Sequence, residues 1–290
     1  MLSTTGIQAS DSSEFVLSAV LGTRIHPPGY PLLSLWGGAF QWISDNPMWN
    51  TAVAMGIVHS MAVTLLFDAL HRWTKSIWLS LWVVALLTMQ PLWLRYSTIP
   101  EAFPALSLVY AGVVWLLSFE RTTNRHAWVF SMVLCLGIAT HHLFVLAAPV
   151  LVWLAWRLRH RWWVWASGIV VGFGSYGMLF VEAQSDWSWG EVSSFTDATR
   201  YFLRSDYGTF QITHHTQAGT WWGTPWMYIK TLMTESWGMF ALGFLALPKL
   251  KRTETLLLIS WFLSSIAVLS LFGMPTDSTF LAHSNRFFLS

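Results

Sequence analysis

Long apolar stretches constrain this chain more than any other feature, because each is long enough to cross a bilayer. The hydrocarbon core is about 30 Å thick and takes roughly 20 apolar residues in a helix. Across the 290 residues 54% are hydrophobic and 10% are charged, whereas soluble domains are about 25% charged. The sequence therefore predicts an all-α, polytopic transmembrane helical bundle that forms one domain over residues 1–290. The predicted spans are 47–70, 76–94, 101–119, 162–180, 232–248 and 255–273.

Residues 127–156 have a different pattern, in which two shorter apolar pieces meet at Thr140-His141-His142. Each piece is short for a full span, so we predict a hairpin whose tip carries His141 and His142 into the membrane or a cavity. Polar groups are costly in that location, which makes a functional role the default hypothesis. Hydrogen bonds from the imidazoles to backbone carbonyls are the simpler alternative. Residues 30–43 predict a short interfacial helix.

Basic residues are unevenly distributed between the loops, and this bias predicts an orientation. With residues 1–46 outside as the first external loop, residues 181–225 form a long external loop. Most acidic residues then also fall outside, which indicates that ionisable chemistry gathers on the outer face. The 21 tryptophans are typical of membrane–water interfaces. The predicted inner basic residues are Arg72, Lys75, Arg121, Arg125, Arg157, Arg159, Arg161, Lys249, Lys251 and Arg252.

The first external loop holds a pair of carboxylates followed by a proline-rich turn. Asp11 and Glu14 are three residues apart and would share one face of a helix. The run His26-Pro27-Pro28-Gly29-Tyr30-Pro31 stiffens the chain after them, because each proline fixes φ and restricts the preceding residue. A rigidly held acid pair at a membrane surface suits a transferase that activates a hydroxyl group. The structural alternative is that the pair caps a helix beginning near residue 13.

Several motifs together resemble the polytopic protein O-mannosyltransferase-like family of the C-type glycosyltransferase (GT-C) superfamily. The resemblance rests first on Asp-x-x-Glu-Phe at 11–15, Leu21-Gly22 and the His-Pro-Pro-Gly-Tyr-Pro block at 26–31. Against the family pattern, Ser13 stands where a glycine is usual. The first span and the C-terminal spans are also expected to be missing, so the chain is expected to be a fragment. Further motifs match in order: Tyr96-Ser97 with Glu101 and Phe103, Thr140-His141-His142, and Asp206-Tyr207-Gly208-Thr209-Phe210.

The resemblance implies an inverting, multi-pass glycosyltransferase whose active face is periplasmic, extracellular or ER-lumenal. It would move a sugar, with mannose the leading candidate, from a polyprenyl-phosphate donor to a hydroxyl of a protein, glycan or lipid acceptor. Such a transfer needs a base for the acceptor hydroxyl, which we assign to Asp11, with Glu14 in a positioning role and Glu101 as a third catalytic candidate. An arginine would stabilise the leaving phosphate. The expected substrate-binding residues are His26, Tyr30, Tyr96, His141, His142, Arg204, Asp206 and Arg286.

Other interpretations stay open from the residues alone. Glu101 would also suit the positive end of a helix dipole, and outer arginines can extend to the interface without binding substrate. His141/His142, His214/His215 and Asp11/Glu14 are chemically suitable for a metal, but none has a diagnostic spacing. We predict no required cofactor, with a divalent metal as the open alternative, and no basic patch predicts nucleic-acid binding. Sugar stacking is expected of Trp221 and Trp222. The alternative function is a transporter or flippase, which would favour ionisable residues near the middle of the membrane and internal repeats.

Overall fold

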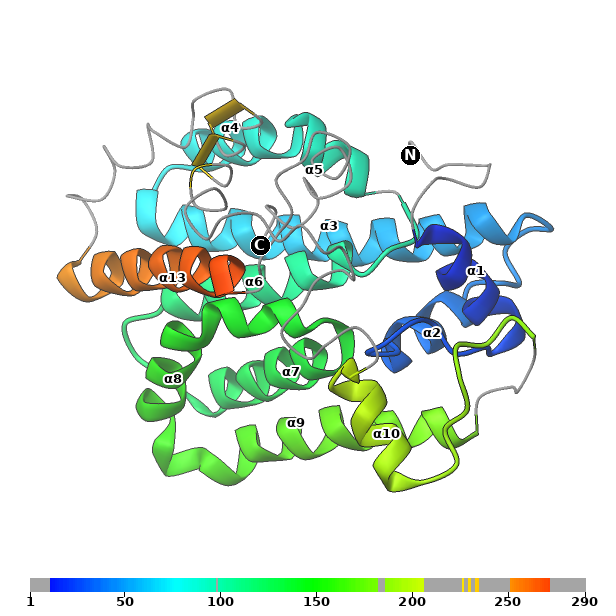
Figure 1. The fold of residues 1–290 in the computed structure, drawn as a ribbon. Coiled ribbons are helices and arrows are strands. Elements are labelled where there is room, and N and C mark those ends of the chain that lie inside the picture. Colours follow the sequence, from blue (N-terminus) through cyan, green and yellow to red (C-terminus); the bar gives the residue numbers. More distant parts are fainter. Residues whose placement is uncertain are drawn as a thin grey trace.

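The computed structural model describes residues 11–97, 99–181, 186–205, 226, 229–230, 233–234 and 251–271. These residues form helices joined by turns and contain no β-strand (Figure 1), in agreement with the predicted all-α class. The helices are α1 (Ser12–Leu21), α2 (Pro31–Gly38), α3 (Pro47–Thr74), α4 (Ile77–Thr88), α5 (Pro91–Tyr96), α6 (Phe103–Leu117), α7 (Asn124–Thr140), η1 (His142–Ala147), α8 (Ala148–Arg157), η2 (Arg159–Arg161), α9 (Trp162–Gly174), η3 (Ser175–Phe180), α10 (Phe195–Phe202) and α13 (Arg252–Leu271).

Helix α3 begins where the sequence offers both a cap and a proline. The Asn46 side chain accepts a hydrogen bond from the Trp49 backbone N–H at 3.0 Å, and Pro47 occupies the first turn. The helix runs for 28 residues until Lys75, which ends it in the left-handed conformation at φ 55°. The predicted span at 47–70 is therefore a helix that continues to residue 74.

Small residues allow α7 and α9 to approach each other closely. A Cβ atom on Gly168 would lie 2.0 Å from the Ser131 carbonyl oxygen, and one on Gly172 would lie 3.0 Å from that of Cys135. Because Gly168 meets Ser131 and Gly172 meets Cys135, the two helices run in parallel. Close contact of this kind at small residues is typical of helices packed in a membrane.

The structure corrects the predicted span at 76–94. The apolar stretch is divided into α4, which ends at Thr88, and the short α5, which begins at Pro91. Proline disfavours a helical conformation in the residue before it and cannot donate a backbone hydrogen bond. The continuous helix therefore stops two residues before Pro91.

Two of the described helical segments are long and apolar enough to cross a membrane, at Pro47–Thr74 and Arg159–Phe180. The second coincides with the predicted span at 162–180. Helices α4 and α6 are shorter, at 12 and 15 residues. The predicted span at 255–273 is helical as α13, which covers Arg252–Leu271 but is not one of these two segments. Most of the predicted span at 232–248 lies outside the described residues.

The predicted hairpin at 127–156 is present as α7, η1 and α8. Helix α7 ends at Thr140, and His141 is extended with φ −161° before η1 begins at His142. Two hydrogen bonds hold the η1 backbone: Tyr110 donates its hydroxyl to the Leu143 carbonyl, and Ser264 donates to the Leu146 carbonyl. The two histidines thus lie at the turn between the two arms, as expected.

The bundle has two chemically different ends. At one end lie α1, α2, the starts of α3 and α6, and the turn that follows α7 (Figure 1). Phe15, Tyr30, Met55 and Ala102 form one buried cluster there, which joins α1, α2, α3 and the start of α6. At the other end the last turns of α3 and α6 meet the first turns of α7 and α9. We call these the α1 end and the α7-start end.

Candidate functional site

The loop at 22–30 is held in one conformation by contacts from distant parts of the chain. Gly22 ends α1 in the left-handed conformation, with its N–H donating to the Ser18 carbonyl. Gly29 has φ 103°, and a Cβ atom there would lie 3.0 Å from Leu179 and 3.2 Å from Tyr201. Tyr201 of α10 also donates its hydroxyl to the Ile25 carbonyl. The loop is therefore packed against η3 and α10 as well as α1.

Arg24 joins this loop to the segment around Trp189. Its buried guanidinium donates to the carbonyl oxygens of Leu179 at 3.3 Å, Trp189 at 3.4 Å and Gly190 at 2.9 Å. Arg24 lies in the predicted first external loop and is, by its charge, a candidate for the leaving phosphate. Its hydrogen bonds to backbone oxygens instead give it a structural role.

Asp11, Glu14 and His26 form a compact cluster at the start of α1. Glu14 Oε2 accepts two hydrogen bonds from His26, from the backbone N–H at 3.0 Å and from Nδ1 at 2.9 Å. The other ring nitrogen, Nε2, lies 3.2 Å from the Tyr30 hydroxyl and 3.9 Å from Asp11 Oδ2. An ionised carboxylate can only accept, so Nδ1 carries the proton toward Glu14 and Nε2 can accept from Tyr30. The sequence predicted all four of these residues, and the structure brings them together.

The two carboxylates have different surroundings. Burial by itself raises the pKa of the Glu14 carboxyl, but the hydrogen bonds from the His26 ring, the His26 backbone and the Trp189 side chain outweigh it, so the pKa of Glu14 lies below its usual value. Asp11 occupies the N-cap position of α1 without a side-chain capping hydrogen bond. The structure therefore does not support the helix-capping alternative for Asp11.

A row of aromatic rings extends the cluster toward the hairpin tip. The His141 ring lies 5.9 Å from the centroid of Tyr30 and 5.9 Å from that of Phe103, and Phe103 lies 5.6 Å from Tyr96. His141 is buried, and its Nδ1 accepts from the Leu143 backbone N–H at 3.0 Å. His141 and Tyr96 therefore connect to the cluster through aromatic packing.

Glu101, His142 and Arg204 are the remaining predicted residues in the described part of the chain. Glu101 is buried at 1% exposure just before α6. The His142 ring packs edge-to-face on Phe202 of α10 at 4.8 Å, and Arg204 lies near it in the left-handed conformation. Asp206, Arg286, Trp221 and Trp222 lie outside the described residues, as does most of the predicted external loop at 181–225.

Trp189 is a site residue that the sequence did not indicate. Its ring lies 6.2 Å from that of His26 at an interplanar angle of 71°, and it also hydrogen-bonds Glu14. The residue is 165 positions from Arg24, which holds its backbone. The only available signal was its place in the long external loop, because no local pattern predicts a contact across that distance.

A cavity of about 230 Å³ adjoins Trp189, lined also by Pro27, Gly190, Glu191, Asp197, Arg200 and Tyr201.

In the described part of the chain, the side chains of Asp11, Glu14 and His26 lie close enough together to serve as ligands of a metal ion. One atom from each lies within 4.8 Å of the others. The hydrogen bonds from His26 to Glu14 already account for this arrangement, since Nδ1 is occupied as a donor. The cluster therefore combines a hydrogen-bonded Glu14–His26 pair with the Asp11 carboxylate beside it.

Residues 11–164 match the family model described as the protein O-mannosyl-transferase TMEM260 N-terminal domain. This match covers more than half of the chain and includes Asp11, Glu14, His26, Glu101 and the hairpin tip. The chain belongs to this family. The family assignment confirms the O-mannosyltransferase resemblance that the motifs indicated.

Two curated relatives give the same picture. The chain is 25% identical over 237 residues to the protein O-mannosyl-transferase tmem260 of Dictyostelium discoideum, covering 71% of this chain and 29% of that protein. It is 24% identical over 228 residues to the protein O-mannosyl-transferase TMEM260 of Mus musculus, covering 71% of this chain and 32% of that protein. The chain thus spans about a third of the length of these relatives. No solved structure matches the chain.

Proposed function

We propose that this chain carries the catalytic centre of a multi-pass membrane mannosyltransferase with a GT-C-like fold. The enzyme would transfer mannose from a polyprenyl-phosphate donor to a hydroxyl group of a protein acceptor, on the extracytoplasmic side. Family membership and the names of the relatives support the mannosyltransferase class. The carboxylate cluster at the α1 end supports the position of the centre.

One observation carries the assignment of roles within the acid pair. Glu14 accepts two hydrogen bonds from His26, whereas Asp11 lies 3.9 Å from the nearest ring nitrogen, beyond hydrogen-bonding distance. The Asp11 side chain is also the more exposed, at 34% against 29% for Glu14 and 12% for His26. Asp11 is therefore the carboxylate that an acceptor hydroxyl can reach.

The proposed reaction is an inverting displacement at the sugar. Asp11 takes the proton of the acceptor hydroxyl while the oxygen of that hydroxyl attacks the anomeric carbon of the sugar. The bond between that carbon and the phosphate oxygen breaks on the opposite face, so the configuration inverts and the lipid phosphate leaves. Glu14 fixes the His26 ring, and Tyr30 holds the second ring nitrogen, so that the wall beside Asp11 stays rigid. Of the two arginines predicted to bind substrate, Arg204 lies among the described residues, and we assign to it the stabilisation of the negative charge on the leaving phosphate.

Trp189 supplies a surface for the sugar in this proposal. Its half-exposed ring lies beside His26 and Glu14, and aromatic faces pack well against the apolar face of a sugar ring.

The transporter alternative predicted ionisable groups near the middle of the membrane. The acid pair instead lies at an end of the bundle, which favours the enzyme.

The test uses the full-length protein that contains this chain, in purified membranes. Transfer of labelled mannose from polyprenyl-phosphate-mannose to a protein acceptor is compared between the wild type, Asp11→Asn and Asp45→Asn. Loss of a general base typically costs 10²- to 10⁴-fold, so we expect a fall of roughly that size in Asp11→Asn. Asp45 is exposed in the same external segment and outside the cluster, so Asp45→Asn should retain activity. Retained transfer in Asp11→Asn would contradict the proposal.

A further inference from the structure

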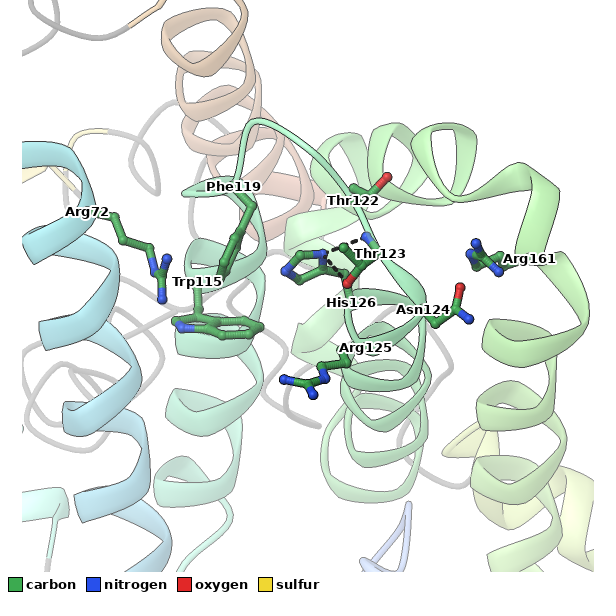
Figure 2. A pocket seen from close by; sticks show the side chains of 9 residues that line it. All are labelled: Arg72, Trp115, Phe119, Thr122, Thr123, Asn124, Arg125, His126 and Arg161. Atoms are coloured by element: carbon green, nitrogen blue, oxygen red, sulfur yellow. Dashed lines mark hydrogen bonds between the residues drawn. The ribbon is translucent and has the colours of Figure 1, made fainter.

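A cavity of about 750 Å³ opens at the α7-start end, on the side of the bundle away from the acid pair (Figure 2). Its size lies within the roughly 300–1,000 Å³ that is usual for small-molecule sites. The wall is formed by the last turn of α3, the last turn of α6 with the residues after it, and the first turns of α7 and α9. The lining residues are Arg72, Trp115, Phe119, Thr122, Thr123, Asn124, Arg125, His126 and Arg161.

The charge of this cavity has one sign. Three arginines line it, and none of the described lining residues is acidic. The backbone N–H groups of the first turn of α7, a helix of 17 residues, add the positive end of a helix dipole. Figure 2 shows the guanidinium groups of Arg72, Arg125 and Arg161 distributed around this turn. The cavity is therefore suited to an anion.

Nearby acidic side chains do not neutralise all three arginines. Asp68 accepts from Arg72 Nε at 2.8 Å and from Trp115 Nε1 at 2.7 Å, and Arg72 lies over the Phe119 ring at 4.1 Å. Glu120 is paired with Lys251. Within the described part of the chain, Arg125 and Arg161 have no ion-pair partner. Their donors, together with the terminal nitrogens of Arg72, remain for a ligand.

The position of the cavity indicates where its ligand comes from. Trp128 of α7 and Trp163 of α9 are exposed and pack edge-to-face at 6.4 Å beside it, and Trp156 and Trp162 are exposed nearby. Exposed tryptophans gather at the level of lipid headgroups. Basic pockets between helices at that level bind the phosphates of anionic lipids.

We propose that this cavity is a binding site for a phosphate group, which the positive charges of Arg72, Arg125 and Arg161 around the start of α7 attract. Guanidinium groups bind phosphate oxygens through paired, charge-assisted hydrogen bonds. The tryptophan rim favours an anionic phospholipid headgroup as the source of that phosphate. The site is separate from the acid pair, so the proposal does not depend on the transfer reaction.

The experiment measures binding to the purified full chain in detergent. The probes are short-chain phosphatidic acid, the matching diacylglycerol that lacks phosphate, and inorganic phosphate. The lining variant is Arg125→Gln with Arg161→Gln. The matched control is Arg121→Gln with Arg159→Gln, which removes the same charge from exposed residues at the same end but outside the cavity. Melting temperatures of all variants show that each is folded.

We expect phosphatidic acid to bind more tightly than diacylglycerol, and the lining variant to weaken that binding by about tenfold or more. The control variant should bind like the wild type. Inorganic phosphate that binds as tightly as phosphatidic acid, and loses affinity in the same variant, would confirm the site and identify soluble phosphate as its source. Equal binding of phosphatidic acid and diacylglycerol, or equal loss in both variants, would overturn the proposal.

Discussion

The two ends of the bundle hold charge in opposite ways. At the α1 end, one carboxylate of the pair, Glu14, is tied to a histidine by short hydrogen bonds, and the loop that follows is held in place by distant residues. At the α7-start end, three arginines line an open cavity and two of them have no ion-pair partner in the described residues. A rigid, hydrogen-bonded group is suited to reaction, whereas unpaired donors in a cavity are suited to binding. We therefore expect substitutions at the two ends to affect different measurements.

At the α1 end, Glu14→Gln should lower turnover strongly, although by no more than Asp11→Asn does. The amide cannot accept both hydrogen bonds from His26 with the strength of a carboxylate, so the wall beside Asp11 loosens. We expect the turnover number to fall by about 10²-fold with little change in the KM for the donor. Steady-state transfer kinetics measure both values. A higher KM with unchanged turnover would show that Glu14 binds the donor instead of positioning His26.

Gly29→Ala tests whether the loop at the α1 end must be rigid. The new Cβ atom would lie 3.0 Å from Leu179 and 3.2 Å from Tyr201, in a backbone with φ 103°. We expect a loss of stability on the order of 1–3 kcal/mol, with a lower melting temperature. Gly174→Ala is the control, because a Cβ atom at Gly174 meets nothing within 4 Å. Equal melting temperatures for the two variants would argue against a strained loop.

Asp68→Asn tests whether the α7-start end depends on hydrogen bonds in the same way. The amide would replace the carboxylate that accepts from Arg72 and Trp115. Because these groups are partly exposed, we expect a loss of about 1 kcal/mol, measured by thermal unfolding. Asp186→Asn, on an exposed residue at the other end, should have no effect. A loss as large as that of Gly29→Ala would mean that the two ends are equally rigid.

The smallest expected effect is on the pH dependence of the melting temperature. The pKa of Glu14 is lowered in the folded state, so its ionised form stabilises the fold above its ordinary value of 4.5, and this contribution is lost as pH falls through the lower folded value. The difference in melting temperature between wild type and Glu14→Gln should therefore shrink between about pH 7 and about pH 3. A difference that grows on acidification would contradict the hydrogen-bonded arrangement.

Local sequence signals predicted much of this molecule, and long-range contacts account for what they missed. The apolar stretch at 47–70 predicted helix α3, and the Asp11–Glu14 spacing with the His26–Pro31 run indicated residues that meet at the α1 end. Hydrophobicity alone did not reveal that Pro91 divides the stretch at 76–94. Trp189 reaches His26 because Arg24 binds carbonyls more than 150 residues away in the sequence, and no periodicity encodes that contact. The catalytic roles of these residues stay predictions.

The most direct measurement compares the two ends in one experiment. Turnover of labelled mannose at saturating polyprenyl-phosphate-mannose is measured for the full-length protein with Asp11→Asn and, separately, with Arg125→Gln and Arg161→Gln. We predict that the first variant loses transfer by roughly 10²- to 10⁴-fold and that the second transfers mannose at the wild-type rate. Wild-type turnover in Asp11→Asn, or equal loss in both variants, would contradict the assignment of the reaction to the α1 end.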